Sequence, residues 1–158
     1  MSRVGHALAQ SNLGVMYGEG HGVPQDYQEA MRWFRLAADQ GNALAQSNLG
    51  VMYGEGHGVP RDDKEAMRWY RLAADQGNAL AEANLGVMFG EGHGVPQDYR
   101  EAMRWSSLAA DQGNALAQFE LGSMYDKGLG VPKDYIQAHM WFNLAGASGN
   151  PGGSTPDR

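Results

Sequence analysis

The chain has 158 residues, with 12 Lys and Arg against 18 Asp and Glu, which gives a formal net charge of −6. This acidic balance, with the arginines spread along the chain instead of clustered, disfavours electrostatic binding to nucleic acid. Cysteine is absent, which excludes a disulfide framework and Cys-ligated zinc and leaves the redox compartment open.

The N-terminal residues MSRVGHALAQ lack the apolar core of a signal peptide, and no run of 18 apolar residues occurs. We therefore expect no membrane insertion and a soluble chain. The compartment stays open: cytoplasm for the chain as given, or periplasm if an upstream signal was removed.

An internal repeat is the main organising feature of the sequence. Glycines at 5, 41, 77, 113 and 149 stand 36 residues apart, and four tryptophans keep the same spacing. Such a period is typical of stacked helical units whose function lies on a surface. It predicts one domain over 1–148 with repeats 5–40, 41–76, 77–112 and 113–148, followed by a disordered tail over 149–158.

The second repeat illustrates the first predicted helix, over 43–53. Gly41 ends the preceding helix at positive φ, and the Asn42 side chain caps the new one. Gly50 costs helix propensity in mid-helix, which indicates a close helix crossing. The stripe expected to be buried comprises Ala45, Leu49, Met52 and Tyr53.

A glycine-rich connector over 54–60 precedes the second predicted helix, over 63–76. Asp62 and Glu65 have the spacing of a capping box. Trp69 stands among alanines at helical spacing, so we expect it to fill the junction with a neighbouring helix pair.

Three successive patterns, A-x-x-x-L-G-x-x-Y, G-x-G-V-x-x-D and A-x-x-W-[YF]-x-x-A-A-x-x-G, resemble the Sel1-like repeat family, a relative of tetratricopeptide repeats. The resemblance implies an all-α fold, a right-handed α-solenoid of four helix–turn–helix units. It also implies a non-catalytic scaffold or adaptor whose first helices line a concave groove that holds other proteins. The residues that carry the resemblance are Ala45, Leu49, Gly50, Tyr53, Gly56, Gly58, Val59, Asp62, Ala66, Trp69, Tyr70, Ala73, Ala74 and Gly77.

By analogy with the tetratricopeptide fold, the groove is expected to use the part of each first helix outside the buried stripe. Asn12, Asn48 and Asn84 form a ladder of amides that can bond the backbone of an extended peptide. The alternative is that they are solvated residues copied with the repeat. The predicted groove residues are Leu44, Ser47, Asn48, Val51, Asn12, Val15, Leu80, Asn84, Val87 and Glu120.

The predicted groove lacks the Lys and Arg with which tetratricopeptide relatives hold a terminal carboxylate. Together with Glu120, this favours a neutral or mildly basic segment over an acidic tail. The partner itself cannot be identified from the sequence.

Other site classes are disfavoured. His21, His57 and His93 recur at one connector position, too far apart to converge on a metal, so we interpret them as loop-packing or solvated residues. No hydrolase, phosphate-loop or zinc-protease motif occurs, and GEGHGV follows a predicted helix instead of a strand. We therefore expect no catalytic residues, no metal and no cofactor.

Departures from the repeat leave a second function open. Ser106 and Ser107 replace an aromatic residue and an arginine, which predicts a loosened third interface or a bare outer face. Neither end has an evident capping helix, so the alternative is a self-assembly module that forms homo-oligomers through its end repeats or its convex face.

Overall fold

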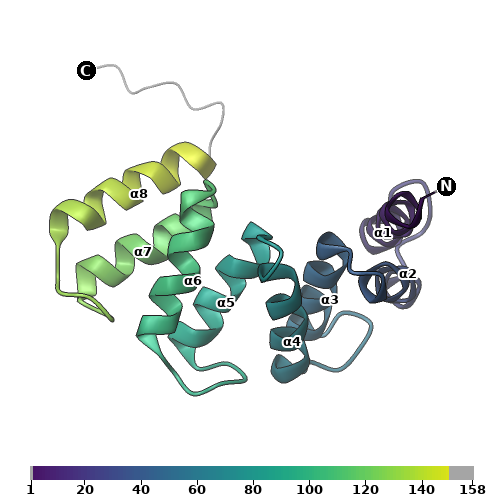
Figure 1. Ribbon diagram of the computed structural model, residues 1–158, viewed down its shortest axis with the longest axis horizontal. Helices are drawn as coiled ribbons and strands as arrows, with labels where there is room; N and C mark the ends of the chain where they lie inside the picture. The colour runs from purple at the N-terminus through teal and green to yellow at the C-terminus, as the bar shows by residue number, and fades with distance from the viewer. Residues whose placement is uncertain (1, 150–158) are drawn as a thin grey trace. The chain divides into compact units, whose positions relative to one another are not determined.

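The computed structural model describes residues 2–149, and all the regular secondary structure in that range is α-helical. The chain divides into two compact units, Met1–Ala81 and Glu82–Arg158, with the boundary in the first turn of the fifth helix (Figure 1). The predicted tail lies outside the described residues, apart from Gly149. In chain order the helices are α1 (Arg3–Glu19), α2 (Tyr27–Asp39), α3 (Ala43–Glu55), α4 (Asp63–Ala74), α5 (Ala79–Glu91), α6 (Tyr99–Asp111), α7 (Ala115–Lys127) and α8 (Tyr135–Gly149).

Side-chain caps explain where the helices begin. Asn42 Oδ1 accepts a hydrogen bond from the Ala45 amide at 2.8 Å, at the start of α3. At the start of α4, Asp62 Oδ1 accepts from the Lys64 and Glu65 amides, both at 3.1 Å. These contacts satisfy amides that have no partner inside the helix, and they confirm both predicted caps.

The reciprocal arm of the predicted capping box is wrong. The Asp62 amide donates to the Tyr53 carbonyl at 2.9 Å, so it has no need of the Glu65 side chain. The Glu65 carboxylate instead accepts from Arg68, with Oε2 3.1 Å from Nη2. The connector therefore closes onto the end of α3, and Glu65 is left to pair along α4.

Glycines allow the two helices of a repeat to cross closely, as predicted. A Cβ atom placed on Gly50 would lie 2.5 Å from ring carbons of Tyr70, a distance that real Cβ atoms do not adopt. The same relation joins Gly14 to Phe34 and Gly122 to Phe142, at 2.6 Å. In these three repeats the glycine leaves room for an aromatic ring from the second helix.

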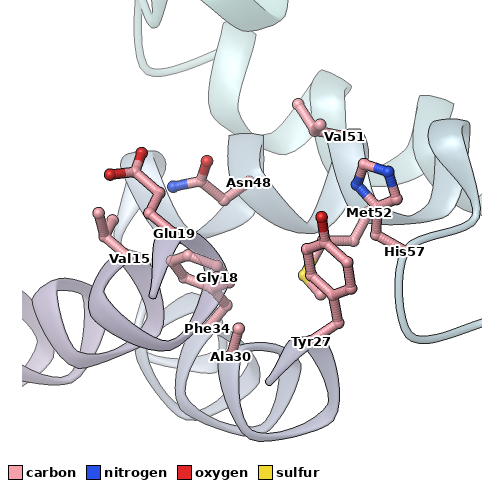
Figure 2. A pocket seen from close by; sticks show the side chains of 10 residues that line it. All are labelled: Val15, Gly18, Glu19, Tyr27, Ala30, Phe34, Asn48, Val51, Met52 and His57. Carbon is pink, nitrogen blue, oxygen red and sulfur yellow. The ribbon is translucent and has the colours of Figure 1, made fainter. Parts of the chain in front are cut away.

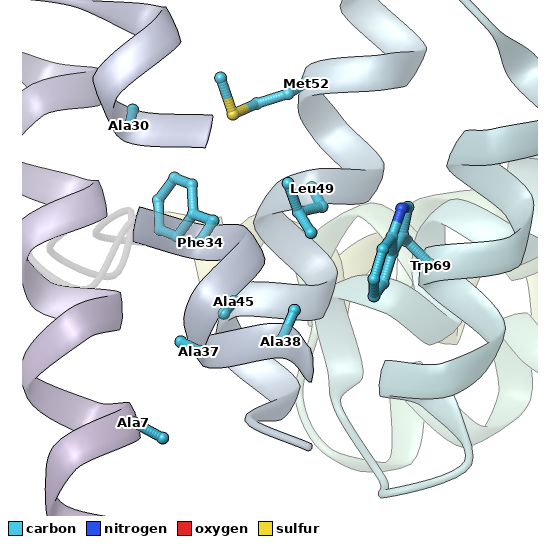
Figure 3. Packing of buried hydrophobic residues seen from close by; sticks show 9 residues of the cluster. All are labelled: Ala7, Ala30, Phe34, Ala37, Ala38, Ala45, Leu49, Met52 and Trp69. Carbon is cyan, nitrogen blue, oxygen red and sulfur yellow. The ribbon is translucent and has the colours of Figure 1, made fainter. Parts of the chain in front are cut away.

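Trp69 fills the junction between two helix pairs in unit 1, which confirms the prediction for this residue. Its side chain is 3% exposed and belongs to one cluster with Phe34 and Leu49 (Figure 3). The Arg68 guanidinium lies 4.4 Å from the centre of the indole. Trp105 is buried in the same way, whereas Trp33 and Trp141 are only partly buried.

A hydrogen bond between polar side chains links the two helices of each repeat at the end opposite the connector. In the second repeat, Gln76 Nε2 donates to Gln46 Oε1 at 2.8 Å, and Gln46 Nε2 donates to the Ala38 carbonyl at 3.3 Å. This link was not among the features predicted from the sequence. The equivalent pairs are Gln40 with Gln10 at 2.6 Å, Gln112 with Glu82 at 2.8 Å, and Ser148 with Gln118 at 2.9 Å.

Candidate functional site

Most of the predicted groove residues are at least partly accessible. Leu44 and Leu80 are 41% and 42% exposed, and Asn12 is also exposed. The remaining accessible members are partly buried: Val15, Asn48, Val51, Asn84, Val87 and Glu120.

Ser47 is the exception, and its placement in an open groove is wrong. Its side chain is completely buried, and its hydroxyl has no hydrogen-bond partner among residues 2–149. α3 packs against both α2 and α4, so only a narrow strip of its surface stays accessible. Ser47 lies outside that strip. Its equivalent on α1, Ser11, is also completely buried.

Unit 1 contains an open cavity of about 210 Å³ that gathers three of the predicted residues, Val15, Asn48 and Val51 (Figure 2). Residues of α1, α2 and α3 form it, together with the connector after α3. Most of its wall was not predicted from the sequence, because residues of the second helices, the connectors and the buried stripe were expected to serve packing alone. The missed residues are Gly18, Glu19, Tyr27, Ala30, Phe34, Met52 and His57.

Aromatic and apolar groups form one wall of the unit 1 cavity. The rings of Tyr27 and His57 are stacked, with centroids 4.6 Å apart and an interplanar angle of 6° (Figure 2). This contact confirms the interpretation of His57 as a loop-packing residue. Gly58 fits against the same tyrosine, since a Cβ there would lie 3.0 Å from Tyr27 Cβ and 3.1 Å from its carbonyl oxygen.

Polar groups stand on the other side of this cavity. Figure 2 shows the Asn48 amide on the same side as Val15 and Glu19. The Asn48 Nδ2 atom is buried and has no hydrogen-bond partner in the described part of the chain. The Glu19 carboxylate, by contrast, lies 3.1 Å from His21 Nδ1. The cavity therefore combines an apolar wall with an unused amide donor.

Unit 2 contains an equivalent cavity of about 150 Å³, formed by α5, α6, α7 and the connector after α7. Val87 and Glu120 of the predicted set line it. Burial raises the pKa of the Glu120 carboxyl above its ordinary value, the nearby Glu91 raises it further, and Lys127 lowers it. The Glu91 carboxylate is also 3.4 Å from His93 Nδ1.

Ser106 lines the unit 2 cavity, and the expectation of a bare outer face at this position is wrong. The residue is 1% exposed and faces Gly86 at the helix crossing, where the other repeats place an aromatic ring. Its hydroxyl has no hydrogen-bond partner within residues 2–149. Ser107 is partly buried, and its Oγ lies 3.7 Å from Met103 Sδ.

No group of three or more His, Asp or Glu side chains within residues 2–149 is arranged to hold a metal ion. None of the described helices has the length and apolar character needed to cross a membrane.

Four consecutive helix pairs, each linked by a side-chain hydrogen bond at the same place, define an all-α repeat protein of the α-solenoid class. The family model for the Sel1 repeat matches residues 7–42, 43–78, 79–114 and 115–150. The chain belongs to the Sel1 repeat family. Sel1 repeat proteins generally act as protein-interaction scaffolds and are generally non-catalytic.

Solved structures support the assignment. The crystal structure of c5321, a protective antigen of uropathogenic Escherichia coli strains with an SLR fold, is 44% identical over 92% of this chain, with a TM-score of 0.86. A Sel1 repeat protein from Oxalobacter formigenes is 37% identical over 92% of the chain, also with a TM-score of 0.86. The chain covers only 31% and 58% of these two structures.

Solved structures of lower identity share the fold alone. The immunity protein Pa5087 from Pseudomonas aeruginosa is 19% identical, with a TM-score of 0.53. The match covers 96% of this chain and 72% of the Pa5087 chain. No curated protein matches the chain.

Proposed function

We propose that this chain is a non-catalytic protein-interaction module that binds an extended peptide, or an extended part of a protein surface, along the accessible strip of its first helices. In unit 1 the strip comprises Leu44, Asn48 and Val51 on α3, with Asn12 and Val15 on α1. The observation that carries the proposal is the unit 1 cavity, where an open apolar wall faces the buried, unpartnered Asn48 amide.

The chemistry of this cavity suits a peptide. Apolar walls with a few polar groups are typical of binding sites, because burial supplies affinity and the polar groups fix orientation. An unpartnered buried amide costs free energy that a peptide carbonyl would recover by accepting its hydrogen bond. Since packed helices lie about 8–10 Å apart and an extended chain rises about 3.3 Å per residue, neighbouring first helices would meet about every third peptide residue.

A random nonapeptide library displayed on phage and panned against the full chain tests the proposal. We expect enriched peptides to bind Asn48→Ala about tenfold more weakly in a polarisation assay, which corresponds to about 1.4 kcal/mol. Gln28→Ala is the matched control, because Gln28 is exposed on α2 and does not line the cavity. Failure to enrich any peptide over an unrelated protein would overturn the proposal.

Self-assembly is the second candidate, and α8 supplies an observation for it. Ile136, Met140 and Leu144 are exposed at a spacing of four residues, with Ile136 84% exposed. At the first two of these positions the other repeats carry Gln or a cation, namely Gln28, Lys64 and Arg100, then Arg32, Arg68 and Arg104. An apolar helical stripe of this kind is typical of association surfaces.

Light scattering over a range of protein concentrations tests self-assembly. If α8 mediates it, the mass rises with concentration, and a double change, Ile136→Lys with Met140→Arg, restores the monomer. A monomer at every concentration would overturn this candidate.

A further inference from the structure

The unit 2 cavity differs from its unit 1 counterpart at a few positions that all change its chemistry. Val87, Gly90, Glu91, Tyr99, Ala102 and Met124 repeat the corresponding unit 1 residues. Four lining positions are substituted: Ser106 in place of Phe34, Glu120 in place of Asn48, Ser123 in place of Val51, and Leu129 in place of His57. Lys127 also lines the unit 2 cavity, and it takes the place of Glu55, which does not line the unit 1 cavity. The unit 2 cavity thus lacks counterparts of the Phe34 and His57 rings and has an additional carboxylate, Glu120.

Glu120 brings a second negative charge to a cavity that already contains Glu91. Its side chain is partly buried, and none of the described residues donates a hydrogen bond to it. Lys127, on the last turn of α7, is the one cation that lines the cavity within the described range. Two carboxylates against one ammonium leave an excess of negative charge.

The buried Ser106 hydroxyl is an independent sign of an absent ligand. It lines the cavity, is 1% exposed and has no partner in residues 2–149. A buried polar atom without a hydrogen bond is unusual in folded proteins. A donor that reached into the cavity would satisfy it.

The remaining wall is apolar. Val87, Tyr99, Met124 and Leu129 line the cavity beside the polar groups. A flexible aliphatic stem can pack on such a surface while its charged head reaches the carboxylates.

We propose that the unit 2 cavity is a subsite for an arginine side chain of the bound peptide, with the guanidinium held by Glu91 and Glu120 and the stem packed on the apolar wall. This inference deepens the proposed function and rests on it. A guanidinium offers five N–H donors in a rigid fork, enough to bond a carboxylate bidentately and also to donate to Ser106 Oγ. Lysine, with a compact ammonium, fits the same charge less specifically.

Unit 1 is not expected to share this preference. Its cavity has the neutral Asn48 at the position of Glu120, so Glu19 is the one carboxylate among the residues that line it. Glu19 and Glu91 each lie beside a histidine, and the difference between the cavities is therefore Glu120. A basic residue of the bound peptide is therefore expected in the unit 2 cavity and not in the unit 1 cavity.

A titration of the full chain followed by amide NMR tests the subsite directly. The probe is N-acetyl-arginine-N-methylamide, and its neutral isostere, N-acetyl-citrulline-N-methylamide, is the control ligand. We expect saturable shifts at Gly86 and Gly90 with the arginine probe, with a Kd on the order of millimolar for so small a ligand, and none with citrulline.

Two single substitutions are expected to change the affinity for the arginine probe in opposite directions. Glu120→Gln should weaken arginine binding at least tenfold, whereas Lys127→Gln should strengthen it severalfold by removing the competing cation. Glu120→Asn, which restores the residue of the other repeats, should behave like Glu120→Gln. Glu19→Gln, in the unit 1 cavity, is the matched control and should leave the arginine titration unchanged.

Absence of saturable shifts, equal binding of citrulline, or an unchanged Kd in a folded Glu120→Gln protein would each overturn the subsite. The two proposals fail separately. Arginine binding without any enriched peptide would overturn the proposed function alone, and peptide binding that is indifferent to Glu120 would overturn the subsite alone.

Discussion

Gln112 Nε2 donates a hydrogen bond to Glu82 Oε2 at 2.8 Å, where the other three repeats use the neutral acceptors Gln10, Gln46 and Gln118. Glu82 is 4% exposed. Burial raises the pKa of its carboxyl above the ordinary value of 4.5, and the hydrogen bond from Gln112 only partly offsets this. The third repeat thus contains a buried charge in a link that elsewhere is neutral.

Glu82→Gln should therefore stabilise the protein at pH 7, by about 1 kcal/mol. Because the folded-state pKa of Glu82 lies above the unfolded value, folding favours the protonated form. The destabilisation is absent below the unfolded pKa, grows as the pH rises towards the folded pKa, and is complete above it. Urea unfolding at pH 7 and at pH 4 measures the difference. An equal gain at both pH values would show that the charge of Glu82 is not the cause.

Gly50→Ala should destabilise the protein by about 1–3 kcal/mol, because the new methyl group would overlap the Tyr70 ring. Gly54→Ala, on the same helix, is the matched control. Its Cβ would lie 3.6 Å from the Ala66 Cβ, an ordinary contact, so improved helix propensity should stabilise by about 0.5–1 kcal/mol. Thermal unfolding of both variants checks the opposite signs, and two changes of the same sign would contradict the packing argument.

Trp69→Ala should cost about 3–5 kcal/mol, because it removes a buried ring from the junction between helix pairs in unit 1. Trp33→Ala removes the equivalent ring of the first repeat, which is only partly buried, and should cost less. Denaturant unfolding gives both values. Equal losses would mean that burial at the junction does not set the stability contribution of the tryptophan.

Ser106→Phe should stabilise the protein by about 1–2 kcal/mol, because a ring at this position can pack on Gly86 as Phe34 packs on Gly14. The change also removes a buried hydroxyl that has no partner among the described residues. Ser106→Ala separates the two effects, since it removes the hydroxyl without adding a ring. Thermal unfolding compares them, and a loss in the phenylalanine variant would show that α5 and α6 leave no room for the ring.

Asn48→Ala combined with Asn84→Ala should weaken peptide binding and leave the free energy of unfolding within about 1 kcal/mol, since both side chains are only partly buried. Fluorescence polarisation with an enriched nonapeptide measures the change in affinity, and thermal unfolding measures the change in stability. Unchanged affinity would remove the amide ladder from the binding surface.

Local chemistry made much of the fold predictable. The Asn42 cap, the close crossing at Gly50 and the burial of Trp69 each depend on residue types and spacings within one repeat. The burial of Ser47 depends instead on which sides of α3 are covered by α2 and α4. Helical periodicity does not contain that information. The bond between Gln46 and Gln76 joins residues 30 positions apart, so no helical spacing points to it.

The candidate site was predictable only in part, for the same reason. Val15, Asn48 and Val51 could be assigned from the first helices, because each lies outside the buried stripe. Tyr27 and His57 complete the cavity wall from a second helix and from a connector, and only the folded chain brings their rings together.

The close packing of Gly58 against Tyr27 affects how a repeat array of this kind can change in length. The two residues belong to different repeats. The connector of the second repeat therefore packs closely against the start of α2 in the first repeat. A short insertion in this connector would separate Gly58 from Tyr27, whereas a whole repeat added beside the pair leaves their contact intact. Lengthening by whole duplicated units therefore preserves a contact that a partial insertion breaks, and the near-identical copies in this chain are of the kind that such duplication produces.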